Sequence, residues 1–344
     1  MTAHGNVFAC IQRITYVSDE IKRIVEELEK FVFESVKSSD KPAIEQLIAD
    51  IKALTDTQNL TADERALLEN ADVTCDKLIA KIDETVAETG RINDAVNSYD
   101  IATVTSDDKE DIEKLIADIK ALTEADNITD DERNQLTAND ETLDALLDKI
   151  DATAEEIGRI EEAVNAYDEK SVKSTDKADL EQLIDDIKAL TDATNITEDE
   201  RTKLGELDAK ADALIKKIDD TAKEIERIEN AVADYDQETV KSSDIPALGK
   251  LIEDIKALTD GDNITEDERT ALEENDKAVD ELVEKLAEVA EEIKRVDEAV
   301  KSYNEETVKS TDKADLAQLK EDIQSLVDSG NTTENEMCSI SCLA

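Results

Sequence analysis

The chain has 344 residues, a formal net charge of −50, 38 % charged residues, 2 % aromatic residues and no tryptophan. Nucleic acids and anionic membrane surfaces attract clustered lysine and arginine, so this acidic balance argues against either as a partner. The sequence contains no run of about 18 apolar residues, so it predicts no membrane insertion. Its first residues do not form a clear signal peptide.

The sequence repeats with a period of 68 residues. The motif N-[IL]-T-x-D-E-R begins at Asn59, Asn127, Asn195 and Asn263, and an altered copy, NTTENEM, begins at Asn331. No insertion or deletion interrupts this series. A fixed period of this length is typical of a repeat array, in which each repeat packs against its neighbours.

Each repeat contains an apolar stripe, by which we mean apolar or small residues at alternating spacings of three and four. Such spacing predicts one long helix that buries a narrow face against partner helices. In residues 197–236 the stripe consists of Leu204, Leu207, Ala211, Leu214, Ile218, Thr221, Ile225, Ile228, Val232 and Tyr235.

A capping box is predicted at the start of each long helix. In this motif the threonine hydroxyl accepts an N–H of the first turn, and the glutamate three residues later reaches back to the threonine amide. The predicted pairs are Thr61 with Glu64, Thr129 with Glu132, Thr197 with Glu200, and Thr265 with Glu268.

A shorter amphipathic helix is also predicted in each repeat, at about residues 41–55 in the first. Ser39 or Asp40 can act as its N-cap. Pro42 and Pro246 share one position in the first helical turn, where a missing N–H costs little.

Two ways of threading the repeats follow. In one, each long helix breaks in the middle, near Asp219–Thr221 in the third repeat. A new helix could then be capped by Thr221, or by Thr85 or Thr153 at the same position of the earlier repeats. In the other, the long helix is continuous. Its C-terminal half then joins the next short helix and the N-terminal half of the next long helix in one bundle. We favour continuity, because residues 284–295 contain no cap or turn residue.

The sequence therefore predicts an all-α fold of tandem 68-residue repeats. These form spectrin-like three-helix bundles in an elongated array, with long helices shared between neighbouring bundles. The predicted parts are a non-repeat leader (1–16), bundles at 17–84, 85–152, 153–220 and 221–288, and an incomplete bundle with an irregular tail (289–344).

The last predicted bundle lacks a long partner helix. Its apolar face should therefore be partly uncovered at Leu316, Leu319, Ile323 and Leu326. Since repeat arrays normally finish with a polar cap, we expect the chain to be a fragment of a longer protein.

Nine of the ten arginines occupy two repeat positions. We expect them to bond carboxylates bidentately, or helix-end carbonyls, and so to lock the bundle geometry. Ordinary exposed helix charges are the alternative. One set is Arg65, Arg133, Arg201 and Arg269, and the other is Arg23, Arg91, Arg159, Arg227 and Arg295.

The residue inventory does not suggest catalysis, a cofactor or a metal site. The only histidine is His4, and nothing around it forms a catalytic centre. Cys75 falls on the apolar stripe, as a small core residue would. Cys338 and Cys342 could form a disulfide or remain thiols, but no histidine lies nearby to complete a metal site.

Two further motifs have simple structural explanations. The N-x-T pattern of the repeated motif matches an N-glycosylation acceptor, but an asparagine that ends one helix before a capping threonine also produces it. Acidic turns such as residues 259–268 lack the ligand order of an EF-hand loop, so we expect no built calcium site.

Residues 172–232 contain an S/T-D-K start, the N-I-T-E-D-E-R turn and the long stripe. In these features they resemble helical modules that occur in tandem in large cell-wall-attached proteins of Gram-positive bacteria. Such modules include FIVAR-like modules and the stalk repeats of giant extracellular matrix-binding proteins. The resemblance covers about residues 17–330. It implies a cell-surface stalk or adhesin segment that binds host or matrix proteins. This chain departs from such proteins in having no recognisable export signal or wall anchor.

We therefore expect a non-enzymatic, monomeric rod that serves as a spacer or adhesin on a bacterial surface. Each repeat would lengthen the rod by some 40 Å, because it adds roughly 25 net helical residues along the rod axis at about 1.5 Å each. The alternative is a module that captures a serum or matrix protein through one helix face of each repeat. Repeat surfaces rich in Asp, Glu and Lys favour the spacer.

Overall fold

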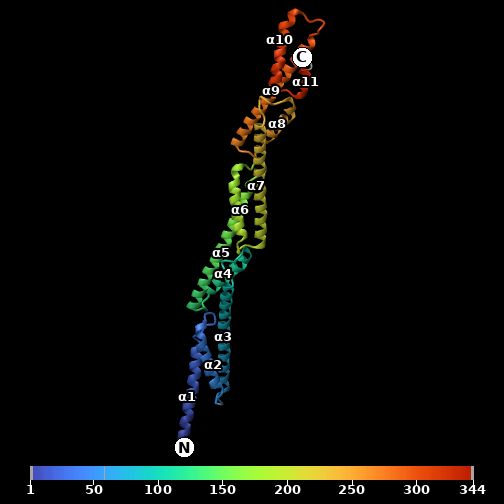
Figure 1. Ribbon diagram of the computed structural model, residues 1–344. Helices are drawn as coiled ribbons and strands as arrows, with labels where there is room; N and C mark the ends of the chain where they lie inside the picture. Colours follow the sequence, from blue (N-terminus) through green and yellow to red (C-terminus); the bar gives the residue numbers. More distant parts are fainter. Residues whose placement is uncertain (1–2, 58, 342–344) are drawn as a thin grey trace. The chain divides into compact units, whose positions relative to one another are not determined.

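The computed structural model describes residues 3–57 and 59–341, with the side chains of residues 6–57 and 59–338. In this part of the chain every regular element is helical, which confirms the predicted all-α fold (Figure 1). The α-helices are α1 Ala3–Leu28, α2 Lys41–Thr55, α3 Ala62–Asn97, α4 Lys109–Thr123, α5 Asp130–Asn165, α6 Lys177–Thr191, α7 Glu198–Ala233, α8 Ile245–Thr259, α9 Glu266–Ser302, α10 Lys313–Asp328 and α11 Glu334–Ser341.

The helices belong to two compact units. The first extends to Ile157 and includes Asp192–Arg201, and the second consists of Gly158–Thr191 and the residues from Thr202 onward.

In the first unit, α2 packs against both α1 and α3, and α1 also contacts α3 (Figure 1). One continuous core joins the C-terminal part of α1, all of α2 and the N-terminal part of α3 as far as Ile82. A second core joins the C-terminal part of α3 from Ile92, then α4, and then α5 as far as Ile150. Because α3 is unbroken, it contributes to both cores, as the continuous threading predicts.

The threonines that could have capped a new helix lie inside continuous helices instead. The Thr85 hydroxyl donates to the Lys81 carbonyl at 3.1 Å, and the Thr153 hydroxyl donates to the Lys149 carbonyl at 2.9 Å. Each is a back-bond to the carbonyl four residues earlier in its own helix. The broken threading is therefore wrong at these two positions.

The second unit repeats the arrangement. The C-terminal part of α7, all of α8 and the N-terminal part of α9 share one core, and the C-terminal part of α9 forms another with α10. Of the ten predicted stripe residues in 197–236, eight are buried, and Thr221 and Tyr235 are half-buried. Burying a leucine or isoleucine side chain contributes roughly 1.5–3 kcal/mol, so this stripe supplies most of the packing energy of the long helix.

The start of the short helix differs from the prediction. Asp40 precedes α2, but its side chain does not cap that helix. A 3₁₀ turn, Ser38–Asp40, leads directly into α2, so Asp40 already has helical backbone angles. Its carboxylate points back and accepts the Lys37 amide N–H at 2.9 Å, which closes the turn.

The N-terminal end differs from the prediction, whereas the C-terminal end agrees with it. Helix α1 begins at Ala3 and so passes through the segment that we expected to be a non-repeat leader. At the other end, Leu319 and Leu326 are buried, whereas Leu316 and Ile323 are half-buried. The short α11 packs against α9 and α10 there, so the apolar face is only partly uncovered.

Candidate functional site at the repeat junctions

One set of arginines links each long helix to the short helix that follows it. Arg91 on α3 binds the carboxylate of Glu88 through Nε at 2.9 Å and Nη2 at 2.6 Å, and its Nη2 also donates to Asp118 on α4 at 2.5 Å. The equivalent links between helices are Arg23 with Asp50, Arg159 with Asp186, Arg227 with Asp254, and Arg295 with Asp322.

These pairs affect the ionisation of their partners. The guanidinium of Arg91 lowers the pKa of Glu88, and Arg227 and Arg295 lower the pKa of Glu224 and Glu292 in the same way. The Arg91 side chain is still 48 % exposed, and exposed pairs contribute little stability. The arginines of this set therefore connect the helices while each pair adds little stability.

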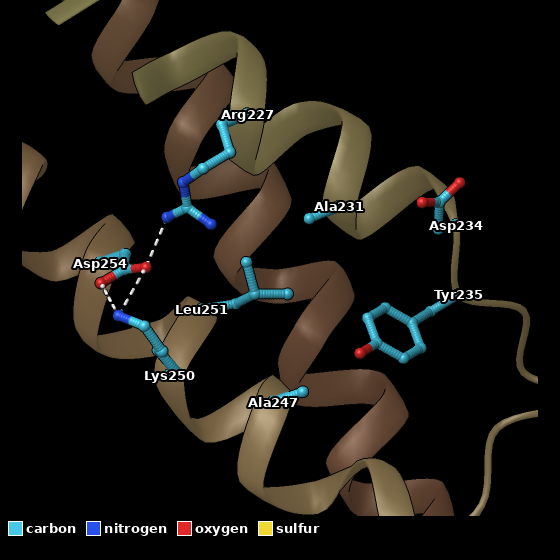
Figure 2. Close-up of a pocket in the computed structure, with 8 residues that line it drawn as sticks. All are labelled: Arg227, Ala231, Asp234, Tyr235, Ala247, Lys250, Leu251 and Asp254. Atoms are coloured by element: carbon cyan, nitrogen blue, oxygen red, sulfur yellow. Dashed lines mark hydrogen bonds and ion pairs between the residues drawn. The ribbon is translucent and has the colours of Figure 1, made fainter. Parts of the chain in front are cut away.

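Figure 2 shows one of these links, between α7 and α8. Arg227 and Lys250 both face Asp254, and Tyr235 lies beyond the end of α7, opposite Ala247. Together with neighbouring residues they line a hollow of about 270 Å³. Three of its charged groups, Arg227, Lys250 and Asp254, are engaged with one another and so link the two helices.

The second set of arginines binds backbone carbonyls at the end of each short helix or in the turn after it. Arg133 Nη2 donates to the Ala125 carbonyl at 2.9 Å, and Arg269 Nη2 donates to the Gly261 carbonyl at 2.8 Å. Arg65 and Arg201 make the same type of contact, to Thr55 at 3.3 Å and Ala193 at 3.2 Å. Each guanidinium thus satisfies a carbonyl at or just beyond the helix end, where no helical partner is present.

Each predicted threonine and glutamate pair lies at the start of a long helix. The Thr129 hydroxyl accepts the Glu132 amide N–H at 3.2 Å, and Glu132 Oε2 accepts the Thr129 amide N–H at 2.7 Å. The pairs Thr61 with Glu64, Thr197 with Glu200, and Thr265 with Glu268 have the same geometry. The altered fifth copy keeps it too, at Thr333 and Glu336.

The capping glutamate has a second role that the sequence analysis missed. Ser38 Oγ donates to Glu132 Oε1 at 2.7 Å, although 94 residues separate them. The same bond joins Ser106 to Glu200 at 2.8 Å and Ser242 to Glu336 at 2.7 Å. One carboxylate therefore caps its own long helix and also holds the turn that precedes the short helix of the repeat before it. We call this contact the junction bond.

The junction environment determines the ionisation of Glu132. Partial burial opposes its ionisation, but the Thr129 amide and the Ser38 hydroxyl outweigh that effect and lower its pKa. Glu268 has a lowered pKa for the same reasons, with Thr265 and Ser174 as its partners. The junction bond is therefore a hydrogen bond to an ionised carboxylate, which is the stronger kind.

The asparagine of the repeated motif also connects distant segments. Asn127 Nδ2 donates to Thr85 Oγ1 at 2.7 Å, and Asn195 Nδ2 donates to Thr153 Oγ1 at 2.7 Å. In the fifth copy the position equivalent to Thr85 is Val289. There Asn331 donates instead to the carbonyls of Gln237 at 2.8 Å and Val240 at 3.0 Å.

Burial of these asparagines bears on the glycosylation motif. Asn127, Asn195 and Asn331 are only 7 %, 9 % and 2 % exposed. A buried amide with a protein partner is not available as an acceptor, so their role in the folded chain is structural. Thr221 and Asn263 have the same 42-residue spacing, but Asn263 donates to the Glu169 carbonyl at 2.7 Å, so the spacing alone could not have revealed the pairing.

The described residues include no group of three or more His, Cys, Asp or Glu side chains that could hold a metal ion. Cys75 is buried, as predicted, and burial raises the pKa of its thiol to about 11. The side chains of His4 and Cys342 lie outside the described residues. Among the described helices, none combines the length and the apolar character needed to cross a membrane.

Together these contacts define an all-helical repeat protein whose recurrent polar residues join helix to helix and repeat to repeat. No family model, curated protein or solved structure matches the chain.

Proposed function

We propose that the chain is a non-enzymatic spacer, in which the repeats are strung end to end through continuous long helices and junction bonds. The observation that carries this proposal is the recurrence of the junction bond at Ser38, Ser106 and Ser242 with one fixed sequence separation. A contact that recurs in this way fixes the same relation between successive repeats, as a spacer of regular length needs.

The polar residues support the same proposal. The recurrent arginines, threonines, glutamates and asparagines bind other groups of the chain itself, so their repetition is explained by structure. The net charge of −50 further favours an extended chain, because like charges repel.

Small-angle X-ray scattering on the full chain and on a variant lacking one whole period, such as residues 130–197, tests the proposal. The deletion keeps the register of every remaining contact. It should shorten the maximum dimension by about 40 Å, since each repeat adds roughly 25 net residues at about 1.5 Å. A compact particle, or a deletion that leaves the maximum dimension unchanged, contradicts the spacer.

We further propose that the spacer belongs to a bacterial surface protein, on the strength of the resemblance of residues 172–232 to wall-attached stalk repeats. Antibodies raised against the chain should label intact cells of the source organism, and brief protease treatment of those cells should remove the signal. Labelling that appears only after the cells are permeabilised contradicts this location.

A further inference from the structure

The two ends of the described chain expose apolar residues that the intervening repeats bury. On α1, Val7 is 59 % exposed, Ile11 is 56 % exposed and Ile14 is 69 % exposed. The 68-residue step aligns Val7 with Cys75, Leu143, Ala211 and Val279, each 0 % exposed. It aligns Ile14 with Ile82, Ile150, Ile218 and Leu286, none more than 4 % exposed. The first half of α1 is therefore the N-terminal half of a long helix with its apolar stripe uncovered.

The opposite end exposes the complementary surface. Val308 is 41 % exposed, whereas its equivalents Val36, Val104, Val172 and Val240 are each 2 % exposed. Beside it, between the end of α9 and α10, lies a groove of about 680 Å³, whose apolar lining is Val300, Tyr303, Val308, Leu316, Leu319 and Ile323.

A complete bundle shows what covers such a groove. In the second bundle, Val104 and Ile112 share a core with Leu143, Leu146 and Ile150 of α5. The covering element is thus the N-terminal half of a long helix. Its stripe positions are those that Val7, Cys10 and Ile14 occupy on α1.

The register of the two ends also agrees. Helix α11 ends at Ser341 and occupies the position of the first turns of a long helix. Five periods span 340 residues, so Ala3, where α1 begins, corresponds to position 343 of the same numbering. In this register the stripe of a second copy's α1, from Val7 onward, would follow α11, while residues 341–344 of one copy share their repeat positions with residues 1–4 of the next.

The polar junction contacts match in the same register. Ser310 stands at the repeat position of the serines that make the junction bond, and Glu64 stands at the position of their acceptors. Within the described chain, Glu64 accepts hydrogen bonds from Thr61. A hollow of about 440 Å³ beside it is lined by Arg13, Ile14 and Asn59 among others. This places a serine hydroxyl at one end of the molecule and its expected carboxylate partner at the other.

Charge favours the same pairing. Residues 1–18 contain no aspartate or glutamate and carry Arg13, in a chain with a net charge of −50. The segment that forms the groove, residues 297–322, has eight carboxylates and four lysines. A basic helix end is thus complementary in charge to an acidic groove, and Arg13 has lysine at its equivalent positions Lys81, Lys149, Lys217 and Lys285.

We propose that α1 of a second copy of this chain binds the groove between α9 and α10, so that copies associate head to tail. Because the two surfaces are different, a dimer leaves the groove of one copy and the α1 of the other unoccupied. Further copies can bind there, so the contact generates linear assemblies of growing length. The sequence-based expectation of a monomeric rod is the alternative that the next experiment tests.

Sedimentation velocity in reducing buffer, from about 1 to about 300 µM, spans the range expected for a contact of this modest size. The weight-average mass of the wild-type chain should rise steadily with concentration. The double variant I11D/I14D removes the apolar face of α1, and V308D removes that of the groove. Each should weaken association at least about 30-fold, because it places a carboxylate in an apolar contact.

A mixing experiment identifies the geometry. I11D/I14D retains an intact groove and V308D retains an intact α1, so an equimolar mixture should form a heterodimer and nothing larger. Val73→Asp is the matched control, since Val73 is 52 % exposed on α3 and a glutamate, Glu141, occupies its position in the next repeat. That variant should associate as the wild type does. Unchanged helical circular dichroism and melting confirm that each variant is folded.

Three outcomes overturn the proposal. A wild-type chain that remains monomeric at all concentrations eliminates the contact. A V308D chain that associates normally shows that α1 pairs with something other than the groove. A mixture that fails to dimerise shows that the two surfaces are not partners.

Discussion

The junction bond between Ser38 and Glu132 gives a prediction that the structure allows us to size. A hydrogen bond to a charged group contributes about 1.5–3 kcal/mol when water is excluded. Here the carboxylate is only partly buried, so water competes and we expect about 1 kcal/mol. That corresponds to about a fivefold change in an equilibrium constant. The coupling acts between residues 94 positions apart, whose oxygen atoms lie 2.7 Å apart.

A double-mutant cycle of Ser38→Ala and Glu132→Ala measures this coupling, with native-state hydrogen exchange of α2 and of the first turns of α5 as the readout. The single variants should each raise exchange in both segments. The double variant should be less damaged than the sum of the singles by about 1 kcal/mol.

Glu64→Ala is the matched control, because Glu64 makes the same capping box without a serine partner in the described chain. Combined with Ser38→Ala it should show no coupling. The reasoning fails if Ser38 and Glu132 couple by less than about 0.3 kcal/mol, or if Glu64 couples to Ser38 as strongly as Glu132 does.

Three further predictions follow from the same contacts. Thr153→Val leaves the buried Asn195 amide without its hydroxyl partner and should cost about 1–3 kcal/mol, seen as a lower urea midpoint; an unchanged midpoint contradicts a structural role for the pair. Arg91→Lys removes the bidentate geometry of a half-exposed pair and should cost less than about 1 kcal/mol, with the difference vanishing in high salt; a larger, salt-independent loss refutes this estimate. The pKa of Glu268 lies below its unfolded value of about 4.3, so its contribution to folding stability is complete above that pH and is lost as pH falls through the folded pKa. Glu268→Gln should therefore flatten the acid limb of a plot of unfolding free energy against pH. An acid limb identical to that of the wild type excludes Glu268 as a contributor.

The sequence by itself determined the local structure. The three-and-four spacing of apolar residues and the threonine followed three residues later by glutamate both depend on contacts within about one helical turn. The fixed period repeats the same local contacts along the chain. Hence the predicted short helix at 41–55 agrees with α2, and the stripe at 197–236 agrees with the buried face of α7. The two repeated arginine positions could also be singled out, because Arg65 and Arg91 recur without drift.

Only the tertiary structure decided which partner each recurrent residue binds. Arg91 reaches Asp118, Asn127 reaches Thr85, and Ser38 reaches Glu132, at separations of 27, 42 and 94 residues. Periodicity cannot select among the many carboxylates and hydroxyls that recur with the same 68-residue step. The choice depends on which faces of different helices meet when the apolar stripes are buried, and that is a property of the packed bundles rather than of any single segment.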